Sequence, residues 1–197
     1  MSQVDDKEVI LQLQEGSLDA LGKLYDRHRQ MVFRTALAIT GDQDAACDLL
    51  QDVFLRLFRF AERIDSNRPL EPWLYRMTTN LTYTWVKRNN CWMHSLEDVA
   101  EWLVGTGNNM PHEVAEKRDD WSQVQRAVSS LPLPQRVVIV LYYLNDLSLQ
   151  EISDILEVPE GTIKSRLYYG RLALKKSLRL GLYGEGEKLT ELNYERP

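Results

Sequence analysis

The sequence lacks the features that mark secreted and membrane proteins. Its 197 residues include only two cysteines, too few for the disulfide framework of a small secreted fold, so both thiols are expected to be reduced. No apolar run approaches the length of about 20 residues that a membrane-spanning helix needs. Residues 1–10 are polar and acidic and have neither the basic start nor the apolar core of a secretion signal. These absences predict a cytoplasmic protein without membrane insertion.

A surplus of positive charge is also missing, which at first argues against a nucleic-acid partner. Lysine and arginine number 24 against 29 aspartates and glutamates, a net charge of −5, whereas binding to phosphates requires basic side chains. The charge is unevenly spread, however. Residues 159–180 hold six basic side chains and one acid, and residues 73–90 hold three basic side chains and no acid. These two basic islands in an acidic chain are candidate DNA-binding segments.

Strand-like alternation of apolar and polar residues is scarce, and nearly every periodic segment has helical spacing. Ser17 can cap a long helix that ends at Gly41, and Asp42 can cap a second helix that runs to about Ile64. Because 44% of the residues are hydrophobic, the chain has enough apolar side chains to build a core. The expected fold class is therefore all-α.

Periodicity weakens in the middle of the chain, which predicts two small helical domains. Residues 92–120 are expected to form a flexible acidic linker, because acids outnumber bases there and Gly, Asn and Pro cluster at the centre. Residues 1–91 then form the first domain, residues 121–180 the second, and residues 181–197 a C-terminal tail.

The last helix of the first domain is expected over residues 73–88. It follows a loop from Asp65 to Pro72, from which two prolines exclude helix. Helical spacing gives it one apolar face and an opposite polar stripe. The stripe consists of Arg76, Asn80, Tyr83 and Lys87.

The segment from Leu147 to Leu180 has the pattern of a helix-turn-helix that reads duplex DNA. Ser148 and Glu151 have the spacing of a capping box, which predicts a short helix ending near Leu156. A turn over Val158–Gly161 leads into a final helix with one apolar and one basic face. The alternative, a solvated amphipathic helix, explains the basic residues but not their combination with the cap and the turn.

Five short segments carry a resemblance to a known family. They are Leu131-Pro-Leu-Pro-Gln-Arg136, Leu147-Ser-Leu-Gln-Glu-Ile152 and Glu160-Gly-Thr-Ile-Lys-Ser-Arg-Leu167 in the second domain, with Asp48-Leu-Leu-Gln-Asp52 and Trp73-Leu-Tyr-Arg76 in the first. The first three resemble region 4, and the last two region 2, of extracytoplasmic-function (ECF, group IV) sigma factors of the sigma-70 family. The order of the motifs makes the resemblance specific.

The resemblance implies a sigma factor. Such a protein binds the beta and beta-prime subunits of core RNA polymerase, directs it to promoters, reads −10 and −35 elements and begins to melt the duplex. The family also implies control by an anti-sigma factor, with no catalysis, cofactor or metal. The −35 element would be contacted by Glu160, Thr162, Lys164, Ser165, Arg166, Tyr168, Tyr169 and Arg171. The −10 element would be contacted by Asp65, Ser66, Asn67, Arg68, Arg76, Asn80, Tyr83 and Lys87. Core polymerase would be contacted by Asp48, Gln51 and Asp52.

Some positions depart from the family pattern or stay open. Glu157 stands where a glycine commonly ends the first helix of the helix-turn-helix, so the geometry of the turn is open. Aromatic side chains can stack on single-stranded DNA at about 1–3 kcal/mol per base, and Trp73, Tyr75 and Trp85 are candidates. Core packing is favoured for Trp85, whereas Tyr75 fits either environment.

Two cysteines and the tail carry weaker signals. Cys91 and His94 have the spacing of half a zinc site, but four ligands are needed and no second pair lies nearby. Cys47 lies in a predicted helix beside apolar neighbours and is expected to be buried and unreactive. The acidic tail is expected to fray in solvent, and an autoinhibitory contact with a basic island is the alternative.

Two rival functions compete with a sigma factor. A dimeric helix-turn-helix repressor or activator would bind a palindrome without polymerase, but it has no use for the polar stripe between residues 73 and 90. An enzyme is disfavoured because the sequence has no phosphate-binding glycine loop, metal cluster or Ser/His/Asp arrangement.

Overall fold

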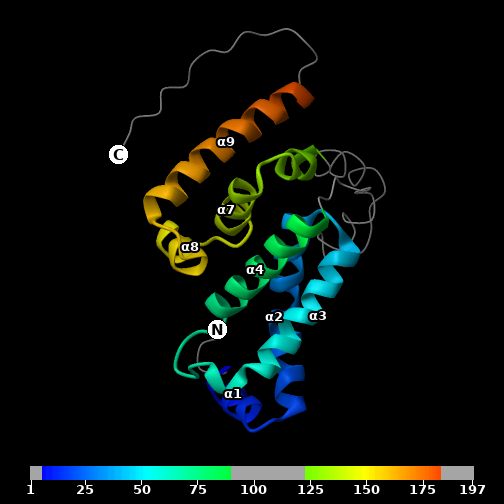
Figure 1. Ribbon diagram of the computed structural model, residues 1–197, viewed down its shortest axis with the longest axis vertical. Coiled ribbons are helices and arrows are strands. Elements are labelled where there is room, and N and C mark those ends of the chain that lie inside the picture. Colours follow the sequence, from blue (N-terminus) through cyan, green and yellow to red (C-terminus); the bar gives the residue numbers. More distant parts are fainter. Residues whose placement is uncertain (1–5, 90–122, 183–197) are drawn as a thin grey trace, which may run out of the picture.

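The computed structural model describes residues 6–89 and 123–182, and these form helices joined by short turns, without a strand. The all-α prediction is confirmed. Figure 1 shows two helix groups, α1–α4 and α7–α9, stacked along the long axis, and a further helix over residues 123–129 precedes α7. The elements are α1 (Asp6–Gln14), α2 (Leu18–Thr40), α3 (Gln43–Arg59), the 3₁₀ helix η1 (Ala61–Arg63), α4 (Glu71–Asn89), α7 (Leu133–Tyr143), α8 (Leu149–Leu156) and α9 (Glu160–Leu182).

Local caps set the ends of α2 and α3 as predicted. The Ser17 hydroxyl accepts a hydrogen bond from the amide of Ala20 at 3.2 Å. Gly41 ends α2 with φ of +69°, in the left-handed region that glycine adopts without steric cost. The Asp42 carboxylate accepts from the amide of Ala45 at 2.9 Å and begins α3.

The predicted end of α3 near Ile64 is wrong, because the α-helix ends at Arg59 and η1 follows. The reason is a tertiary contact. The Gln14 side-chain amide donates to the carbonyl oxygens of Ala61 at 3.1 Å and Ile64 at 2.8 Å. These bonds from α1 contact both ends of the 3₁₀ turn, in which the Ala61 carbonyl also accepts from the amide of Ile64 at 3.0 Å. Sequence periodicity contains no information about such a partner, which lies far away along the chain.

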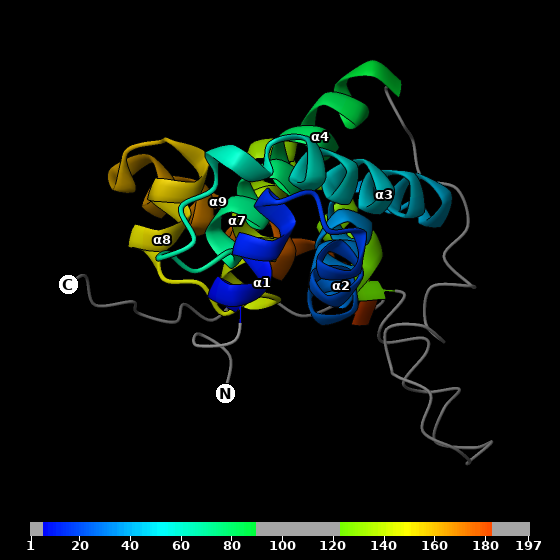
Figure 2. The same cartoon turned by 90° about the horizontal axis from the view of Figure 1, so that it is seen from below.

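The α1–α4 group has its own apolar core. Leu24, Leu57 and Leu74, from three different helices, are fully buried in it. Trp85 packs against the edge of this core, as the sequence predicts, and Trp73 does the same. Figure 2 shows α2 and α3 together on one side of the molecule and α8 on the other. No helix in residues 6–89 and 123–182 is long and apolar enough to cross a bilayer.

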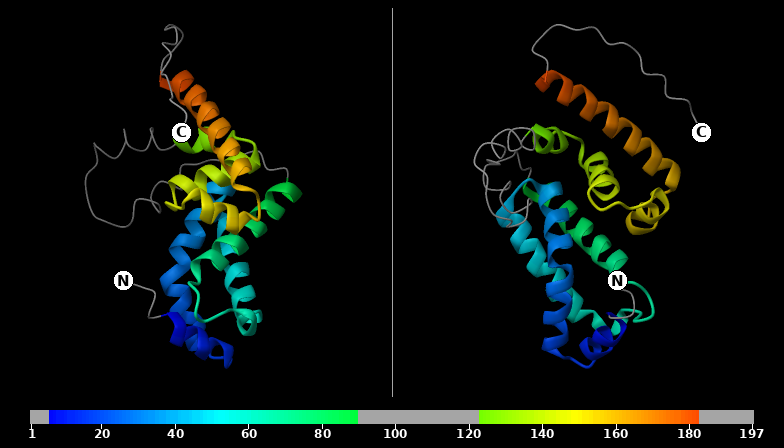
Figure 3. Two further views of the ribbon diagram at one scale, coloured as in Figure 1. Left: turned by 90° about the vertical axis from the view of Figure 1, so that its left-hand side faces the viewer. Right: turned by 180° about the vertical axis from the view of Figure 1, so that it is seen from behind.

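The α7–α9 group forms around Ile152 of α8 and Ile163 of α9, both fully buried. Two residues of the first group, Ile39 and Tyr75, belong to this second core rather than to the first. Consequently α2 packs on α7 and α4 packs on α8, an arrangement visible from behind in Figure 3. The sequence context of Tyr75 fits either core packing or an exposed position, and the structure places it in the core, where it is 8% exposed.

A close approach of α9 to α7 requires a glycine at position 170. A Cβ atom added there would lie 2.9 Å from Cγ1 of Ile139. We expect Gly170→Ala to lower the free energy of unfolding by about 1–3 kcal/mol, because overpacking forces side chains off their rotamers. Urea denaturation measures the change, and the matched control Gly161→Ala meets no atom within 4 Å. Equal stability of the two variants would contradict the packing argument.

Candidate nucleic-acid interface

The turn between α8 and α9 has the geometry of a helix-turn-helix. The Ser148 hydroxyl accepts from the amide of Glu151 at 3.2 Å, and the Glu151 carboxylate accepts from the amide of Ser148 at 2.8 Å. The predicted capping box is therefore present, and the hydrogen bonds that the Ser148 hydroxyl and the Ser148 amide donate to the Glu151 carboxylate lower the pKa of Glu151. Glu157 ends α8 without a glycine, because its own backbone adopts the left-handed conformation with φ of +54°. Only three residues then separate α8 from α9.

A side-chain bond that the sequence analysis missed holds this turn. The Ser153 hydroxyl donates to the carbonyl oxygen of Val158 at 2.7 Å, and the amide of Val158 donates to the carbonyl of Ser153 at 3.2 Å. Because serine and threonine commonly bond to nearby backbone groups, a serine two turns before α9 is the signal that would have indicated it.

The first three turns of α9 carry most of the side chains predicted to contact the −35 element. Ser165, Tyr168 and Tyr169 are exposed, and Thr162 and Arg166 are half-buried. The Lys164 ammonium lies 2.9 Å from the Glu160 carboxylate, so these two candidates form an exposed ion pair. The opposite side of the helix buries Ile163 and Leu167. The two-faced character expected of the helix is confirmed.

Arg171, another candidate for the −35 element, is held by tyrosines of α7. Its Nε donates to the Tyr143 hydroxyl at 2.6 Å, and its guanidinium lies 5.2 Å and 5.4 Å from the ring centres of Tyr142 and Tyr143. Stacking on tyrosine rings suits a planar guanidinium. This support restricts where Arg171 can point, and no spacing rule along the chain would have predicted it.

The polar stripe of α4 is partly covered. Asn80 and Lys87 are exposed, whereas Tyr83 is half-buried beneath the Lys87 ammonium at 4.8 Å. Arg76 reaches the second helix group. Its Nη1 lies 2.8 Å from Oε1 of Glu157, and its Nη2 donates to the carbonyl oxygen of Asp154 at 2.6 Å. The stripe is therefore one surface on α4, but its first member is engaged by α8.

The loop before α4 is a preformed turn. The Asp65 carboxylate accepts from the backbone amide of Asn67 at 3.0 Å and from its side-chain amide at 3.2 Å. These bonds, chiefly the one from the backbone amide, lower the pKa of Asp65. Arg68 is exposed and lies 3.4 Å from the same carboxylate, and Ser66 is half-buried. The four candidate residues thus form one compact polar turn.

The outer edge of α3 carries the residues predicted to bind core polymerase. Asp48, Gln51 and Asp52 are exposed, while Leu49 and Val53 on the opposite side are buried. Leu55 is 64% exposed one turn beyond Asp52, and Phe58 is 37% exposed. An acidic edge next to exposed apolar side chains has the composition of a protein-binding surface.

Comparisons with known proteins identify the family of the chain. Residues 24–90 match the family Sigma-70 region 2, and residues 121–174 match the family Sigma-70, region 4. The chain is 32% identical to the ECF RNA polymerase sigma factor SigW of Bacillus subtilis, over 88% of this chain and 96% of SigW. The protein belongs to the ECF sigma factors of the sigma-70 family. It is thus a DNA-binding subunit that directs RNA polymerase to promoters.

Solved structures share the fold of this sigma factor. CnrH in complex with the cytosolic domain of CnrY has a TM-score of 0.67 at 20% identity, covering 89% of this chain and 97% of that chain. The sigma factor RpoE of Bartonella quintana, in complex with the anti-sigma factor NepR, has a TM-score of 0.62 at 18% identity, covering 81% and 96%. At such identities the likeness establishes the fold.

The sequence-based expectation for Cys47 is wrong, because the sigma factor exposes this side chain. It lies one residue before Asp48 on the outer edge of α3, where helical rotation carries it away from Ala46 and Leu49. Partial desolvation and the neighbouring carboxylates of Asp44 and Asp48 raise the pKa of its thiol.

Cys47 is therefore expected to be accessible but slow to react, because the thiolate is the nucleophile and its population falls as the pKa rises. At pH 7.5, a value chosen below the thiol pKa, iodoacetamide should modify Cys47 more slowly than the same residue in urea-unfolded protein. Asp48→Asn should raise the native rate, and Asp26→Asn on α2 is the control. A native rate equal to the unfolded rate would contradict the raised pKa.

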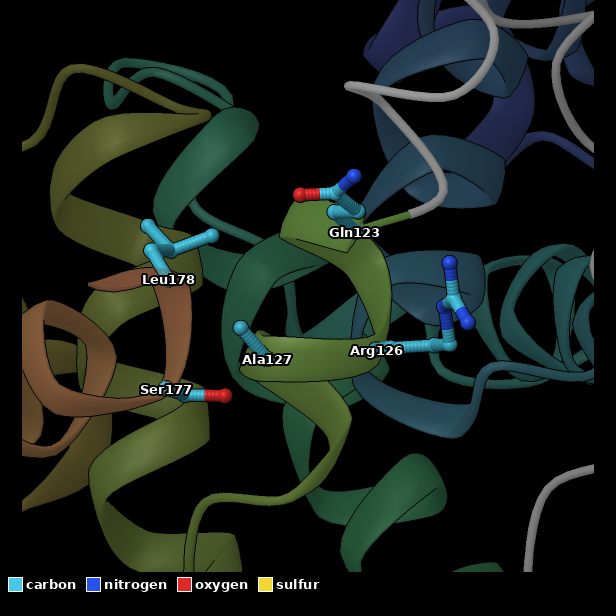
Figure 4. Close-up of a pocket in the computed structure, with 5 residues that line it drawn as sticks. All are labelled: Gln123, Arg126, Ala127, Ser177 and Leu178. Carbon is cyan, nitrogen blue, oxygen red and sulfur yellow. The ribbon is translucent and has the colours of Figure 1, made fainter. Parts of the chain in front are cut away.

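Two further features of the sigma factor lie away from these surfaces. Asp6, His28 and Glu71 place their possible ligand atoms within 4.8 Å of one another. The Asp6 carboxylate also lies 2.6 Å from the Arg27 guanidinium, which favours an ion pair with Arg27 over a bound metal ion. A pocket of about 330 Å³ lies between the 123–129 helix and α9. Figure 4 shows Ala127 facing Ser177 and Leu178 across it, with Arg126 extending away from α9.

Several predictions fall outside the described residues. These are the acidic linker, the metal-like pair Cys91 and His94, and the tail beyond Leu182. The predicted start of the tail at residue 181 is wrong, because Gly181 and Leu182 belong to α9.

Proposed function

We propose that this sigma factor divides its work among three surfaces. The exposed face of α9 reads the −35 element, the stripe of α4 with the 65–68 turn captures the −10 element, and the outer edge of α3 binds core polymerase. One observation carries the proposal: the helix-turn-helix faces solvent with a basic side, in a chain whose net charge is −5. None of these three roles requires the chain to catalyse a reaction. Because its proposed partner is RNA polymerase, we place this sigma factor in the cytoplasm.

Base readout by α9 rests on two side chains of its first turn. A carboxylate accepts from the amino group of cytosine, and a lysine or arginine donates to guanine in the major groove. In the free chain Glu160 and Lys164 satisfy each other, an exposed pair that is typically worth less than about 1 kcal/mol. DNA can therefore separate them at little cost and offer each a base edge.

Capture of the −10 element needs exposed polar groups beside an unstacked base. Removing a base from the stack costs a few kcal/mol, which hydrogen bonds to its free edge can offset. The 65–68 turn presents the exposed amide of Asn67 and the guanidinium of Arg68 next to α4. Asn80 and Lys87 then line a path for the displaced strand.

An anti-sigma factor completes the proposed set of partners. The structural relative CnrH is seen with the cytosolic domain of CnrY, and RpoE of Bartonella quintana is seen with the anti-sigma factor NepR. Because this chain shares their fold, we infer that a protein of this kind also controls it.

Transcription with purified core polymerase on a promoter library tests the proposal. We expect specific start sites that depend on this chain. Tight binding of the protein alone to a palindrome, with no specific initiation, would favour the rival repressor function.

Substitutions in α9 test the assignment to the −35 element. Lys164→Ala or Arg166→Ala is expected to cost about 1–3 kcal/mol of discrimination at one or two positions of the element. The measurement is relative initiation from the library, and Lys176→Ala, an exposed lysine farther along α9, is the control. A loss shared by all sequences would instead assign the residue to a phosphate contact.

A further inference from the structure

Arg171 of α9 is a cation that the fold orients but does not neutralise. Its side chain is exposed, and among the residues that the structure describes none supplies an acidic partner for it. Two other basic candidates for DNA contact are ion-paired, Lys164 with Glu160 at 2.9 Å and Arg76 with Glu157 at 2.8 Å. An exposed cation that is held in place without a counter-charge is available to an anion from outside the protein.

Two tyrosines at the end of α7, which packs against α9, fix the Arg171 guanidinium (Figure 1). Its Nε donates to the Tyr143 hydroxyl at 2.6 Å, and it lies 5.2 Å and 5.4 Å from the ring centres of Tyr142 and Tyr143. The two rings meet at 78° with their centres 5.0 Å apart, so they form two walls of one corner. A side chain that is ordered in advance loses less conformational entropy when it binds a ligand.

Helical geometry places Arg171 relative to the base-reading turn of α9. It follows Lys164 by two turns, which returns it to nearly the same face of the helix, about 10 Å farther along the axis. When the first turn of α9 lies in the major groove, which is about 12 Å wide, a side chain at that distance meets the sugar-phosphate strand that borders the groove. The expected anion is therefore a DNA phosphate.

We propose that Arg171 and Tyr143 together form a phosphate clamp on the strand that borders the −35 element. The bond at Nε leaves both Nη groups of Arg171 to donate in one plane to the oxygens of a phosphate. The Tyr143 hydroxyl accepts from Nε but keeps its own proton, which it can donate to a phosphate oxygen. Tyr143, which is 55% exposed, is thus a positioning residue for Arg171 and a second donor to the DNA.

The clamp rests on the proposed reading of the −35 element by α9, and it extends that function to α7. Tyr143 precedes the Ser148 cap and so lies outside the helix-turn-helix. Phosphate contacts fix the register and orientation of a protein on the duplex but carry no sequence information. The clamp therefore sets the affinity and position of α9, whereas Lys164 and Arg166 supply the discrimination between sequences.

Binding of the holoenzyme to promoter fragments tests the contribution of Arg171. Arg171→Ala should lower the affinity about tenfold, equally for all −35 sequences, because a charge-assisted hydrogen bond to the backbone is lost. The slope of log affinity against log salt concentration should become shallower by about one, since one phosphate is no longer neutralised. Arg171→Lys keeps the charge without the planar donors, and it should restore the slope but only part of the affinity.

Tyr143→Phe tests the hydroxyl separately from the ring. We expect about threefold lower affinity, the effect of a neutral hydrogen bond, with the salt slope and the sequence preference unchanged. The matched control is Tyr142→Phe, which also keeps its ring against Arg171 and removes a hydroxyl that has no bond within residues 6–89 and 123–182. This control should bind like the wild type. Urea denaturation of both variants checks that the fold is retained.

Neutral phosphates locate the contact without any change in the protein. Methylphosphonates, which lack the charge, replace the phosphates along both strands of the −35 element one at a time. One or two positions should weaken binding of the wild-type holoenzyme severalfold. The same positions should cost the Arg171→Ala holoenzyme nothing and the Tyr143→Phe holoenzyme less than the wild type, because the two changes remove one interaction.

Three results would overturn the inference. They are an unchanged salt slope for Arg171→Ala, equal losses of the wild type and Arg171→Ala at every methylphosphonate, and wild-type affinity of Tyr143→Phe. Failure of the proposed function is distinguishable, because the wild-type holoenzyme would then show no preference for any −35 sequence. Failure of the clamp alone leaves that preference intact.

Discussion

Replacing Asp48 and Asp52 together by lysine is expected to lower the affinity of the sigma factor for core polymerase by about a hundredfold. Both carboxylates are exposed on one edge of α3, and their neighbours Leu49 and Val53 anchor that helix in the core. From charge complementarity we expect the part of polymerase that meets this acidic edge to be basic, so the substitution would replace two attractions by two repulsions. Opposed like charges in an interface cost several kcal/mol, and about 1.4 kcal/mol corresponds to a factor of ten.

Binding of labelled sigma factor to core polymerase at low and moderate salt measures this effect, which salt should reduce. The control is Asp26→Lys with Glu62→Lys, two exposed acids outside α3, because it changes the net charge by the same amount. Comparable losses in the two double variants would mean that net charge, rather than the edge of α3, governs binding. Circular dichroism should show unchanged helix content, because the substituted side chains pack on nothing.

Arg136→Ala is expected to have the largest effect on stability, lowering the free energy of unfolding by about 3 kcal/mol. Its guanidinium donates to the carbonyl oxygens of Ser129, Leu131 and Ile39. The Ser129 carbonyl lies at the end of the helix that precedes α7, the Leu131 carbonyl lies just after it, and the Ile39 carbonyl lies near the end of α2. Truncation leaves all three without this donor, and each buried group that loses its partner costs about 1–3 kcal/mol.

Urea denaturation measures the loss, with Arg59→Ala as the control for removing an exposed arginine. Burial lowers the pKa of Arg136, so the cation is desolvated in the folded state and depends on these acceptors. Arg136→Lys keeps the charge but cannot reach three carbonyls in one plane, and it should recover only part of the stability. Full recovery by lysine would show that charge alone, and not the planar geometry, is required.

Features of the site that depend on neighbours along the chain follow from the sequence. The Ser148–Glu151 capping box and the basic side of α9 are read from residues three or four positions apart, because a helix brings those positions together. The polar stripe of α4 follows from the same periodicity. The assignments of these surfaces to the −35 and −10 elements and to polymerase remain predictions.

Features that depend on distant partners could not be predicted. The predicted end of α3 is wrong because of a tertiary contact: the side-chain amide of Gln14, 47 residues before Ala61, donates to the carbonyl oxygen of Ala61. Arg171 is held by the rings of Tyr142 and Tyr143 on another helix. Cys47 shows a related limit, since a position beside apolar residues in sequence can still point outward when the helix rotates by about 100° per residue.

The sequence by itself determined that the described residues are helical and where α2 and α8 begin, because caps and helical periodicity are local. Its short motifs, by their resemblance to a known family, indicated a sigma factor. Only the tertiary structure decided which surface covers each apolar face. An apolar side chain such as Ile39 or Tyr75 specifies burial but not its partner, since the hydrophobic effect is non-directional. That choice joins α4 to α8 in the described structure and engages Arg76 with Glu157.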